Sequence, residues 1–309
     1  MPTAPLWPQL RYDEWKDTLS TLHRWTQVVG KIRLVRAPMQ NHWWHVTLYV
    51  TPRGLTTSTM FAGDGRAFEI AFDFVEDVLT IAVSDGQRAS VALAAMSVAE
   101  FFERLMRELR ALHIEARIDP HPNELPDTTR LDRDTEHATY DPRAAERFWR
   151  ILLQANRLCA AFRAEFIGKS SPVHFFWGSF DLAVSLFSGR RAPPHPGGFP
   201  NLPDRAVQEA YSHEEFTAGF WPGQPGLDAS FYTYIYPEPP GFAQARVRPE
   251  AAAWSALLRE FVLPYEAVRT SPDPERAVLD FFSSTYAAAA NLARWDRAAL
   301  ERRTATVAD

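Results

Sequence analysis

The sequence has few of the residues and patterns that usually point to one specific chemistry. It contains a single cysteine, Cys159, which excludes a disulfide framework and a zinc site with four cysteine ligands. It has no apolar run near the about 20 residues that span a bilayer, and no basic segment followed by an apolar core at its start. We therefore expect a cytosolic protein with no membrane partner. The net charge of −5, with arginine and acidic residues mixed along 309 residues, argues against a nucleic-acid partner.

Lysine is scarce as well, because three lysines stand against thirty arginines. Two of the three, Lys31 and Lys169, directly follow a glycine. An ammonium group binds an anion as a compact point charge, whereas arginine offers a planar fork. We interpret Lys31 and Lys169 as candidate anion-binding residues. The alternative is that the two Gly-Lys pairs arose by chance.

Two common catalytic motifs are missing from the sequence. A phosphate-binding loop needs a glycine five positions before Gly168, and Arg163 stands there. The Gly-X-Ser-X-Gly elbow of serine hydrolases does not occur. No cofactor is indicated by any motif. A metal held jointly by His45, His174 and His213 is left open, because residue types alone do not settle it.

The most distinctive segment present is NHWWHVTLYV, residues 41–50. We interpret it as a β-strand, in which successive side chains point to opposite faces. Trp44 then belongs to an apolar face, whereas Trp43, His45 and Tyr49 share a face that is aromatic and titratable. We expect the chemistry on this second face, with His45 as a general acid or base and with Trp43 and Tyr49 in contact with a ligand.

The spacing of apolar residues predicts an α+β fold of two similar halves, each with antiparallel strands backed by helices. Residues 1–118 form the N-terminal half, 119–141 a proline-rich linker or strap, and 142–309 the C-terminal half. Helices are predicted at residues 10–29, 97–112, 142–166, 254–266 and 274–295. Further strands are predicted at residues 31–35, 55–60, 68–74, 79–83 and 231–236.

Two segments of the chain align by residue type and suggest an internal repeat. Gly30-Lys31, Pro38 and His42 in the first half correspond to Gly168-Lys169, Pro172 and His174 in the second. Such a duplication would place His45 and His174, and also Lys31 and Lys169, on opposite walls of one cleft. His174 is then a second candidate acid or base. Asp181 would orient His174 or, alternatively, cap a helix.

Residues 189–226 are rich in proline and glycine, and they predict a long ordered loop over the interface between the halves. Trp221 is one of its apolar anchors and is expected at the ligand. His213 and Glu214 would deliver an acid/base pair, or would form a solvated pair on a single helical turn. Tyr232 and Tyr234 share one face of the following strand and would line the same cleft.

Long stretches of the sequence resemble an uncharacterised bacterial family that is classed only as a domain of unknown function. The stretches that carry the resemblance include QVVGKIRLVRAPMQNHWWHVTLYVTPRGL (residues 27–55), GKSSPVHFFWGSFDLA (168–183), YSHEEFTAGFWPG (211–223) and YIYPEPPGF (234–242). The resemblance covers the chain almost end to end. It implies no activity, cofactor or catalytic residue.

These patterns together predict that the protein binds a small molecule in an aromatic, histidine-lined cleft between the halves. Hydrolase- or lyase-type acid/base chemistry would extend this function, and whether the protein is an enzyme is left open. The alternative is a non-catalytic interaction or homo-oligomer module that buries the same aromatic face against a partner subunit.

Overall fold

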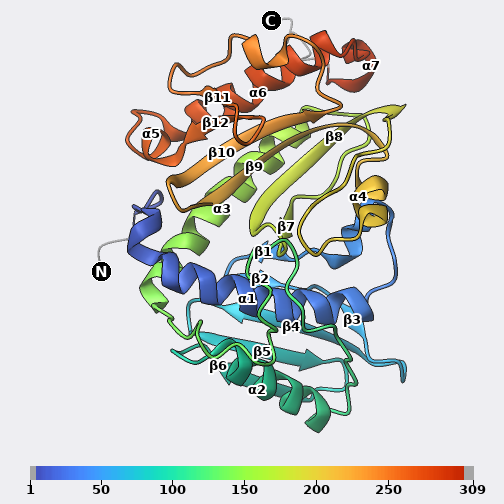
Figure 1. Ribbon diagram of the computed structural model, residues 1–309, viewed down its shortest axis with the longest axis vertical. Helices are drawn as coiled ribbons and strands as arrows, with labels where there is room; N and C mark the ends of the chain where they lie inside the picture. The colour runs from blue at the N-terminus through green and yellow to red at the C-terminus, as the bar shows by residue number, and fades with distance from the viewer. Residues whose placement is uncertain (1–4, 303–309) are drawn as a thin grey trace, which may run out of the picture.

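The computed structural model describes residues 5–302 and shows two six-stranded antiparallel sheets, one in each half of the chain (Figure 1). The predicted α+β fold of two similar halves is confirmed. The first half contains α1 (Tyr12–Arg36), the 3₁₀ segment η1 (Asn41–Val46), β1 (Tyr49–Thr51), β2 (Gly54–Thr56), β3 (Met60–Phe61), β4 (Ala67–Asp73), β5 (Val78–Val83), β6 (Arg88–Ala92) and α2 (Val98–Ala111). The second half contains α3 (Pro142–Ala164), β7 (His174–Phe176), β8 (Asp181–Arg191), α4 (Asp204–Ala210), β9 (His213–Gln224), β10 (Leu227–Tyr236), η2 (Phe242–Gln244), β11 (Ala253–Ser255), β12 (Glu260–Pro264), α5 (Tyr265–Arg269), α6 (Pro274–Leu292) and α7 (Arg297–Leu300).

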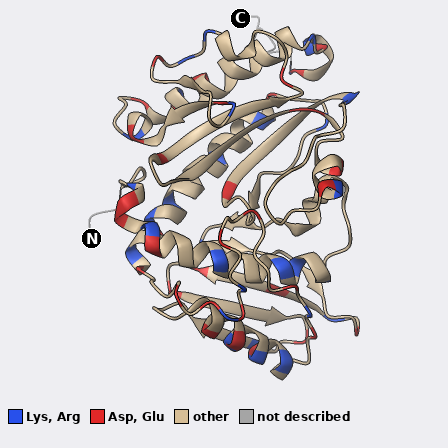
Figure 2. Ribbon diagram, viewed as in Figure 1, with Lys and Arg blue, Asp and Glu red and all other residues tan. Residues whose placement is uncertain are grey.

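The first sheet has the order β1-β2-β4-β5-β6, and β3 pairs with β4. Helix α2 begins as predicted, because the Ser97 hydroxyl accepts a hydrogen bond from the Glu100 amide at 3.2 Å. Its Phe101 ring stacks on Phe72 of β4 at 6.4 Å between centroids. The outer face of α2 carries charges of both signs (Figure 2). An amphipathic helix thus covers one face of this sheet.

The second sheet has the order β11-β12-β10-β9-β8-β7. Alternate residues of its central strands, such as Phe216 and Phe231, form an apolar face that packs against α3 and α6. The Phe162 ring of α3 lies 6.1 Å from the Phe216 ring of the sheet and 5.4 Å from the Phe282 ring of α6. In Figure 1, α3 crosses behind this sheet. The residues in between point to the other face, which is polar.

Helix α1 is longer than predicted and includes residues 31–35, so the strand predicted there is wrong. The glycine at position 30 suggested a break, because glycine is about 1 kcal/mol worse than alanine inside a helix. Gly30 has another purpose in the structure. A Cβ at this position would overlap the indole ring of Trp177, which packs directly on the backbone of α1.

The strand predicted at residues 41–50 is also wrong over most of its length. Residues 41–46 form η1, in which His42 and Trp43 have left-handed φ angles of 57° and 60°. The turn is closed by the Trp43 amide, which donates to the Gln40 carbonyl at 3.2 Å, and by the Thr47 hydroxyl, which donates to the Trp44 carbonyl at 3.1 Å. Side chains of such a turn do not alternate, so the two-face assignment fails.

Two further segments differ from their predictions. Residues 189–226 are not one loop, because β8 continues to Arg191, α4 follows, and β9 begins at His213. Residues 254–266 form β11, β12 and the start of α5 in place of a helix, since Phe261 and Leu263 alternate into the core while Val262 does not. The irregular stretch is therefore confined to residues 192–203.

The strap at residues 119–141 contains neither helix nor strand and is bound to α1. The Arg24 side chain, which is almost fully buried, pairs with Asp127 at 2.8 Å and with Asp134 at 3.2 Å. The Gln27 side chain exchanges two hydrogen bonds of 2.8 Å with the backbone of Asn123. These contacts hold the strap against the helix on both sides of Glu124.

A backbone bridge joins the two sheets. Leu48 and Phe175 exchange backbone hydrogen bonds of 2.9 and 2.8 Å, and the Trp177 indole donates to the Val46 carbonyl at 2.7 Å. The chain therefore joins its halves through the segment that follows η1. Among residues 5–302, no helix combines the length and the apolar character needed to cross a membrane.

We predict that Gly30→Ala destabilises the protein, although alanine is the better helix former. The added methyl overlaps the Trp177 ring, and overpacking of this kind costs about 1–3 kcal/mol. Urea unfolding would measure the loss. In a Trp177→Leu background, where the ring is absent, the same substitution should cost much less. A Gly30→Ala protein as stable as the unmodified chain would contradict this packing.

Candidate functional site

The histidine predicted as the main acid or base, His45, lies in the interior with 2% of its surface exposed. Its Nδ1 accepts a hydrogen bond from the Gln40 amide at 3.3 Å, which helps to close the η1 turn. Burial, and then the nearby Arg33 charge, lower the His45 pKa, so the ring is neutral. The Trp43 ring lies 5.5 Å from it. These contacts give His45 and Trp43 a structural role in η1.

The other predicted histidines, His174 and His213, belong to a row of aromatic rings that joins the second sheet to η1 and β1. The row runs from His213 to His42 (5.7 Å between centroids), Trp44 (4.9 Å), His174 (5.7 Å) and Tyr49 (5.6 Å). His174 is 1% exposed, and burial lowers its pKa to about 3. It is therefore neutral at physiological pH and packs η1 onto the sheet.

The two lysines do not occupy equivalent positions. Lys31 is buried in α1, donates to the Asn123 side chain and lies 5.6 Å from the Trp177 ring, and burial lowers its pKa to about 8. Lys169 is exposed in the connection after α3. The repeat thus aligns residues from different kinds of secondary structure, and the proposed opposite walls of Lys31 and Lys169 are not formed.

His213 and Glu214 point to opposite faces of β9, as neighbours in a strand must. The Glu214 carboxylate pairs with Arg190 at 2.6 Å and accepts a hydrogen bond from Ser188 at 2.9 Å. Burial lowers the pKa of His213, and the charges of His42 and Arg191 add to this effect. These two residues therefore do not form the predicted acid/base pair.

The polar face of the second sheet nevertheless unites half of the residues predicted from the sequence. Strand register pairs His174 with Ala183, Ala183 with Gly219, and Gly219 with Tyr232, so these residues share one face. The predicted residues on this face are His174, Asp181, His213, Trp221, Tyr232 and Tyr234. We refer to this surface as the polar face.

Asp181 is the first residue of β8, pairs with Phe176 of β7, and is 8% exposed. Its carboxyl group accepts hydrogen bonds from the hydroxyls of Ser179 and Tyr232. Burial raises the pKa of Asp181, and the two hydrogen bonds counteract this in part. The predicted alternatives, orienting His174 or capping a helix, are not what these contacts show.

Glu124 reaches the same place from the strap. Its carboxyl group lies against Gly178, where a Cβ would overlap it. Burial raises the Glu124 pKa to about 7, and the negative charge of Asp181 adds to the shift. Gly178 is itself fixed to α1, because the His23 imidazole contacts its carbonyl at 2.9 Å. The strap thus inserts one acid beside another.

Two further glutamates belong to the polar face. Glu215 in β9 faces Tyr236 across the β9–β10 ladder and is 6% exposed. Burial raises the pKa of Glu215 to about 8, and burial together with the charge of Asp181 raises that of Glu260 to about 8. Within residues 5–302, no side chain or amide donates a hydrogen bond to the Glu215 carboxyl group.

Aromatic hydroxyl groups complete the arrangement. The Tyr232 and Tyr234 rings lie parallel, 6.2 Å apart, and the Tyr234 and Tyr211 hydroxyls are 3.0 Å apart. The His195 ring covers Tyr211 at 4.6 Å and Tyr236 at 5.0 Å. Burial raises the pKa values of Tyr211, Tyr232 and Tyr234, so all three are neutral hydrogen-bonding groups.

Sequence reasoning missed Glu124, Glu215, Glu260 and Tyr211. A signal for Glu215 was present, because Glu215, Thr217 and Gly219 alternate with Phe216, Ala218 and Phe220 in a strand pattern. Glu124 gave no local signal, since its position depends on where the strap crosses the sheet. Chemically, the face offers acids that exchange protons near neutral pH and phenols that form hydrogen bonds.

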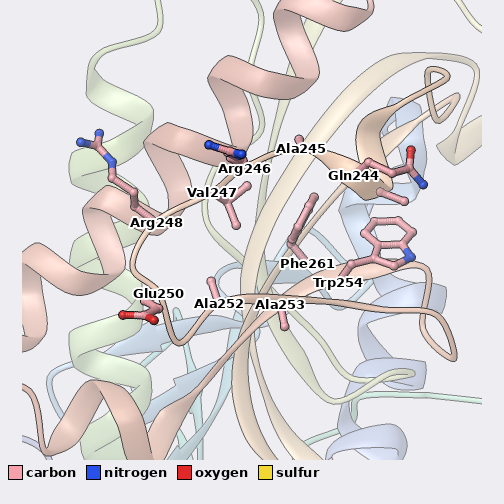
Figure 3. Close-up of a pocket in the computed structure, with 11 residues that line it drawn as sticks. Gln244, Ala245, Arg246, Val247, Arg248, Glu250, Ala252, Ala253, Trp254 and Phe261 are labelled. Atoms are coloured by element: carbon pink, nitrogen blue, oxygen red, sulfur yellow. The ribbon is translucent and has the colours of Figure 1, made fainter.

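The described residues form no metal site, and two hollows of the surface lie away from the residues predicted from the sequence. Among the described residues, no three His, Cys, Asp or Glu side chains are arranged to hold a metal ion. A hollow of about 520 Å³ lies between η2 and β11, beside Trp254 and Phe261, and Figure 3 shows Arg246 and Arg248 pointing away from the Trp254 ring. A second hollow of about 690 Å³ borders α2. Neither contains a residue that was predicted from the sequence.

We predict that Glu215→Gln stabilises the protein at alkaline pH. The folded-state pKa of about 8 exceeds the unfolded value of 4.5, so the stability linked to this group is complete below pH 4.5 and lost as pH rises through 8. The amide cannot ionise, and it should add about 1–3 kcal/mol at pH 9 and little at pH 5. Thermal unfolding at both pH values would test this.

The matched control is Glu214→Gln on the same strand, which removes an ion pair with Arg190 and should give no gain at pH 9. Equal effects of the two substitutions at pH 9 would contradict the unbalanced burial of Glu215.

Comparison with known proteins agrees with the resemblance seen in the sequence. No curated protein and no solved structure matches the chain. One family model does match, and it spans residues 7–302, which include both sheets and the polar face. The chain therefore belongs to the family of unknown function DUF5996.

Proposed function

We propose that this protein binds a polar small molecule on the polar face of the second sheet, and that carboxyl groups there exchange protons with it, as in a hydrolase or lyase. The observation that carries the proposal is the grouping of Asp181 and Glu124 with Tyr232 in a largely buried setting. Buried acids with displaced pKa values occur at functional sites more often than elsewhere, because proton transfer needs a group whose pKa is matched to the working pH.

The two acids of this group are suited to different roles. Glu124 has a pKa of about 7, so it can both give and take a proton near neutral pH. Asp181 is held by Ser179 and Tyr232, which fixes its carboxyl group in one orientation. We assign proton transfer to Glu124, and the binding and orientation of the ligand to Asp181 and Tyr232.

The histidines have a supporting role in this proposal. His174 and His213 border the polar face, but burial lowers the pKa of both rings. They hold η1 against the sheet through Trp44 and His42. We therefore place the chemistry on the carboxyl groups and not on the histidines that the sequence emphasised.

A partner-binding function for the aromatic segment around Trp43 has less support. A docking surface needs exposed side chains. His45 is buried and Trp43, Trp44 and Tyr49 are partly buried within the chain, where they contact His45, His174 and Arg33.

A thermal-shift screen over neutral, cationic and anionic metabolites tests the proposal. A ligand at about 100 times its Kd adds about 2.7 kcal/mol, which corresponds to a rise of about 5 °C in Tm. We expect Tyr232→Phe and Glu124→Gln to reduce this rise. Glu275→Gln, which removes an exposed ion pair with Arg157, should leave it unchanged.

Two results would contradict the proposed site. One is a set of ligands whose shifts survive both polar-face substitutions. The other is a shift that disappears on Trp254→Ala, because Trp254 lines the hollow beside η2 and not the polar face.

A further inference from the structure

We propose that the ligand of the polar face is an organic cation, an amine or a quaternary ammonium, held between the tyrosine rings and the Glu215 carboxylate. This inference rests on the proposed function and adds the chemical class of the ligand. It draws on the charge balance of the face, on the aromatic rings, and on the partnerless carboxyl group of Glu215.

The charge balance of the polar face is strongly one-sided. Four carboxyl groups face it, from β8, β9, β12 and the strap, and they belong to Asp181, Glu215, Glu260 and Glu124. None of them forms an ion pair with any residue between 5 and 302, whereas Glu214 and Glu238, close by in sequence, pair with Arg190 and Arg259. An anion would find no ion-pair partner among these acids, whereas a cation would be balanced by carboxyl groups that ionise as it binds.

The aromatic rings around these acids are suited to the same ligand. The rings of Tyr232 and Tyr234 are stacked with centroids 6.2 Å apart, and Tyr236 lies edge-on to Tyr211 at 5.3 Å. The face of a tyrosine ring attracts a cation, and such rings beside a carboxylate recognise alkylated ammonium groups. Tyr234, Tyr236 and Glu260 keep part of their surface exposed, so this end of the face is open to solvent.

Glu215 provides the independent observation. Its side chain is more than nine-tenths buried, lies on the polar face opposite Tyr236, and has no hydrogen-bond donor among the described residues. A carboxyl group that is largely removed from water and has no counter-charge costs free energy, and a bound cation would offset that cost. Burial raises the pKa values of the tyrosines around it, Tyr211, Tyr234 and Tyr236, and lowers the pKa of His213 two residues away on the same face. None of these groups brings a positive charge at neutral pH. A bound ammonium group would satisfy Glu215.

Cation binding at this place should release protons. The titratable and charged groups that face one another here are Asp181, Glu215, Tyr232, Tyr234, Tyr236, Glu260, Glu124, Tyr211, His195, His174, His213 and, opposite His213, Arg191. Burial raises the pKa values of Glu215 and Glu260 to about 8, so both carry a proton at pH 6. A cation favours the ionised carboxylate, and its affinity should therefore rise by about tenfold per pH unit between pH 6 and 8.

The experiment compares choline with its neutral isostere 3,3-dimethylbutan-1-ol, and putrescine with butane-1,4-diol, by calorimetry on the full chain. Choline keeps its charge at every pH, so the pH dependence reports the protein alone. We expect the cations to bind at least tenfold more tightly than their isosteres and to release about one proton at pH 7. Buffers with different ionisation heats would measure that proton.

Three variants locate the site. Glu215→Gln and Tyr234→Leu should each weaken choline binding by about tenfold, and Tyr234→Phe, which keeps the ring, should weaken it less. Glu275→Gln serves as the matched control on the outer surface. The isostere comparison uses the unmodified chain, so it decides the question even if a variant does not fold.

The outcomes separate the two proposals. Equal binding of choline and its isostere, or choline binding that Glu215→Gln and Tyr234→Leu leave intact, overturns the cation assignment. Binding of neutral or anionic metabolites that depends on Tyr232 and Glu124, with no binding of cations, overturns the cation assignment and keeps the proposed function. Absence of binding by compounds of every charge overturns both.

Discussion

The second sheet is covered on both faces over most of its area, and only one of the two faces is apolar. Hydrophobic side chains such as Phe216 and Phe231 stabilise the side that packs on α3 and α6. The opposite side carries carboxyl and phenol groups whose removal from water costs free energy unless they find partners. Asp181 accepts hydrogen bonds from Ser179 and Tyr232, but no residue between 5 and 302 donates one to the Glu215 carboxyl group. The remaining features of the candidate site follow from this imbalance, because a carboxyl group without a counter-charge keeps its proton to higher pH.

Elements from the first half of the chain assemble this face. Helix α1 binds the strap through Arg24 and Gln27, and the strap inserts Glu124 beside Gly178. The η1 turn covers the β7–β8 side through Trp44, and α4 packs on η1. The candidate site is thus complete only when both halves are folded together. Two glycines permit the close approach, Gly30 under the Trp177 ring and Gly178 under the Glu124 carboxyl group.

Periodicity alone could predict the α+β class, helices α2, α3 and α6, and the strands of the β4–β5 hairpin, because their apolar residues recur at regular spacing. It also placed Tyr232 and Tyr234 on one face of β10. It failed at residues 41–46, since two consecutive left-handed residues leave no trace in an apolar pattern. It failed at Gly30, where a glycine serves a contact 147 residues away in sequence. Glu124 was unpredictable for the same reason, because a residue in an irregular strap gains its surroundings only from tertiary contacts. His45 and His174 were predicted as acid/base residues because a sequence does not distinguish a buried, neutral imidazole from a catalytic one.

The central claim is that the polar face holds carboxyl groups that retain protons close to neutral pH. Carbon-13 NMR titration of the glutamate side-chain carboxyl groups, assigned with Glu124→Gln, Glu215→Gln and Glu260→Gln variants, tests it most directly. The structure predicts three resonances that titrate between about pH 7 and 8, well apart from the exposed glutamates. Titration of all glutamates near pH 4 to 5 would contradict the account, because these acids would then be solvated or paired, and no feature of the face would call for a ligand.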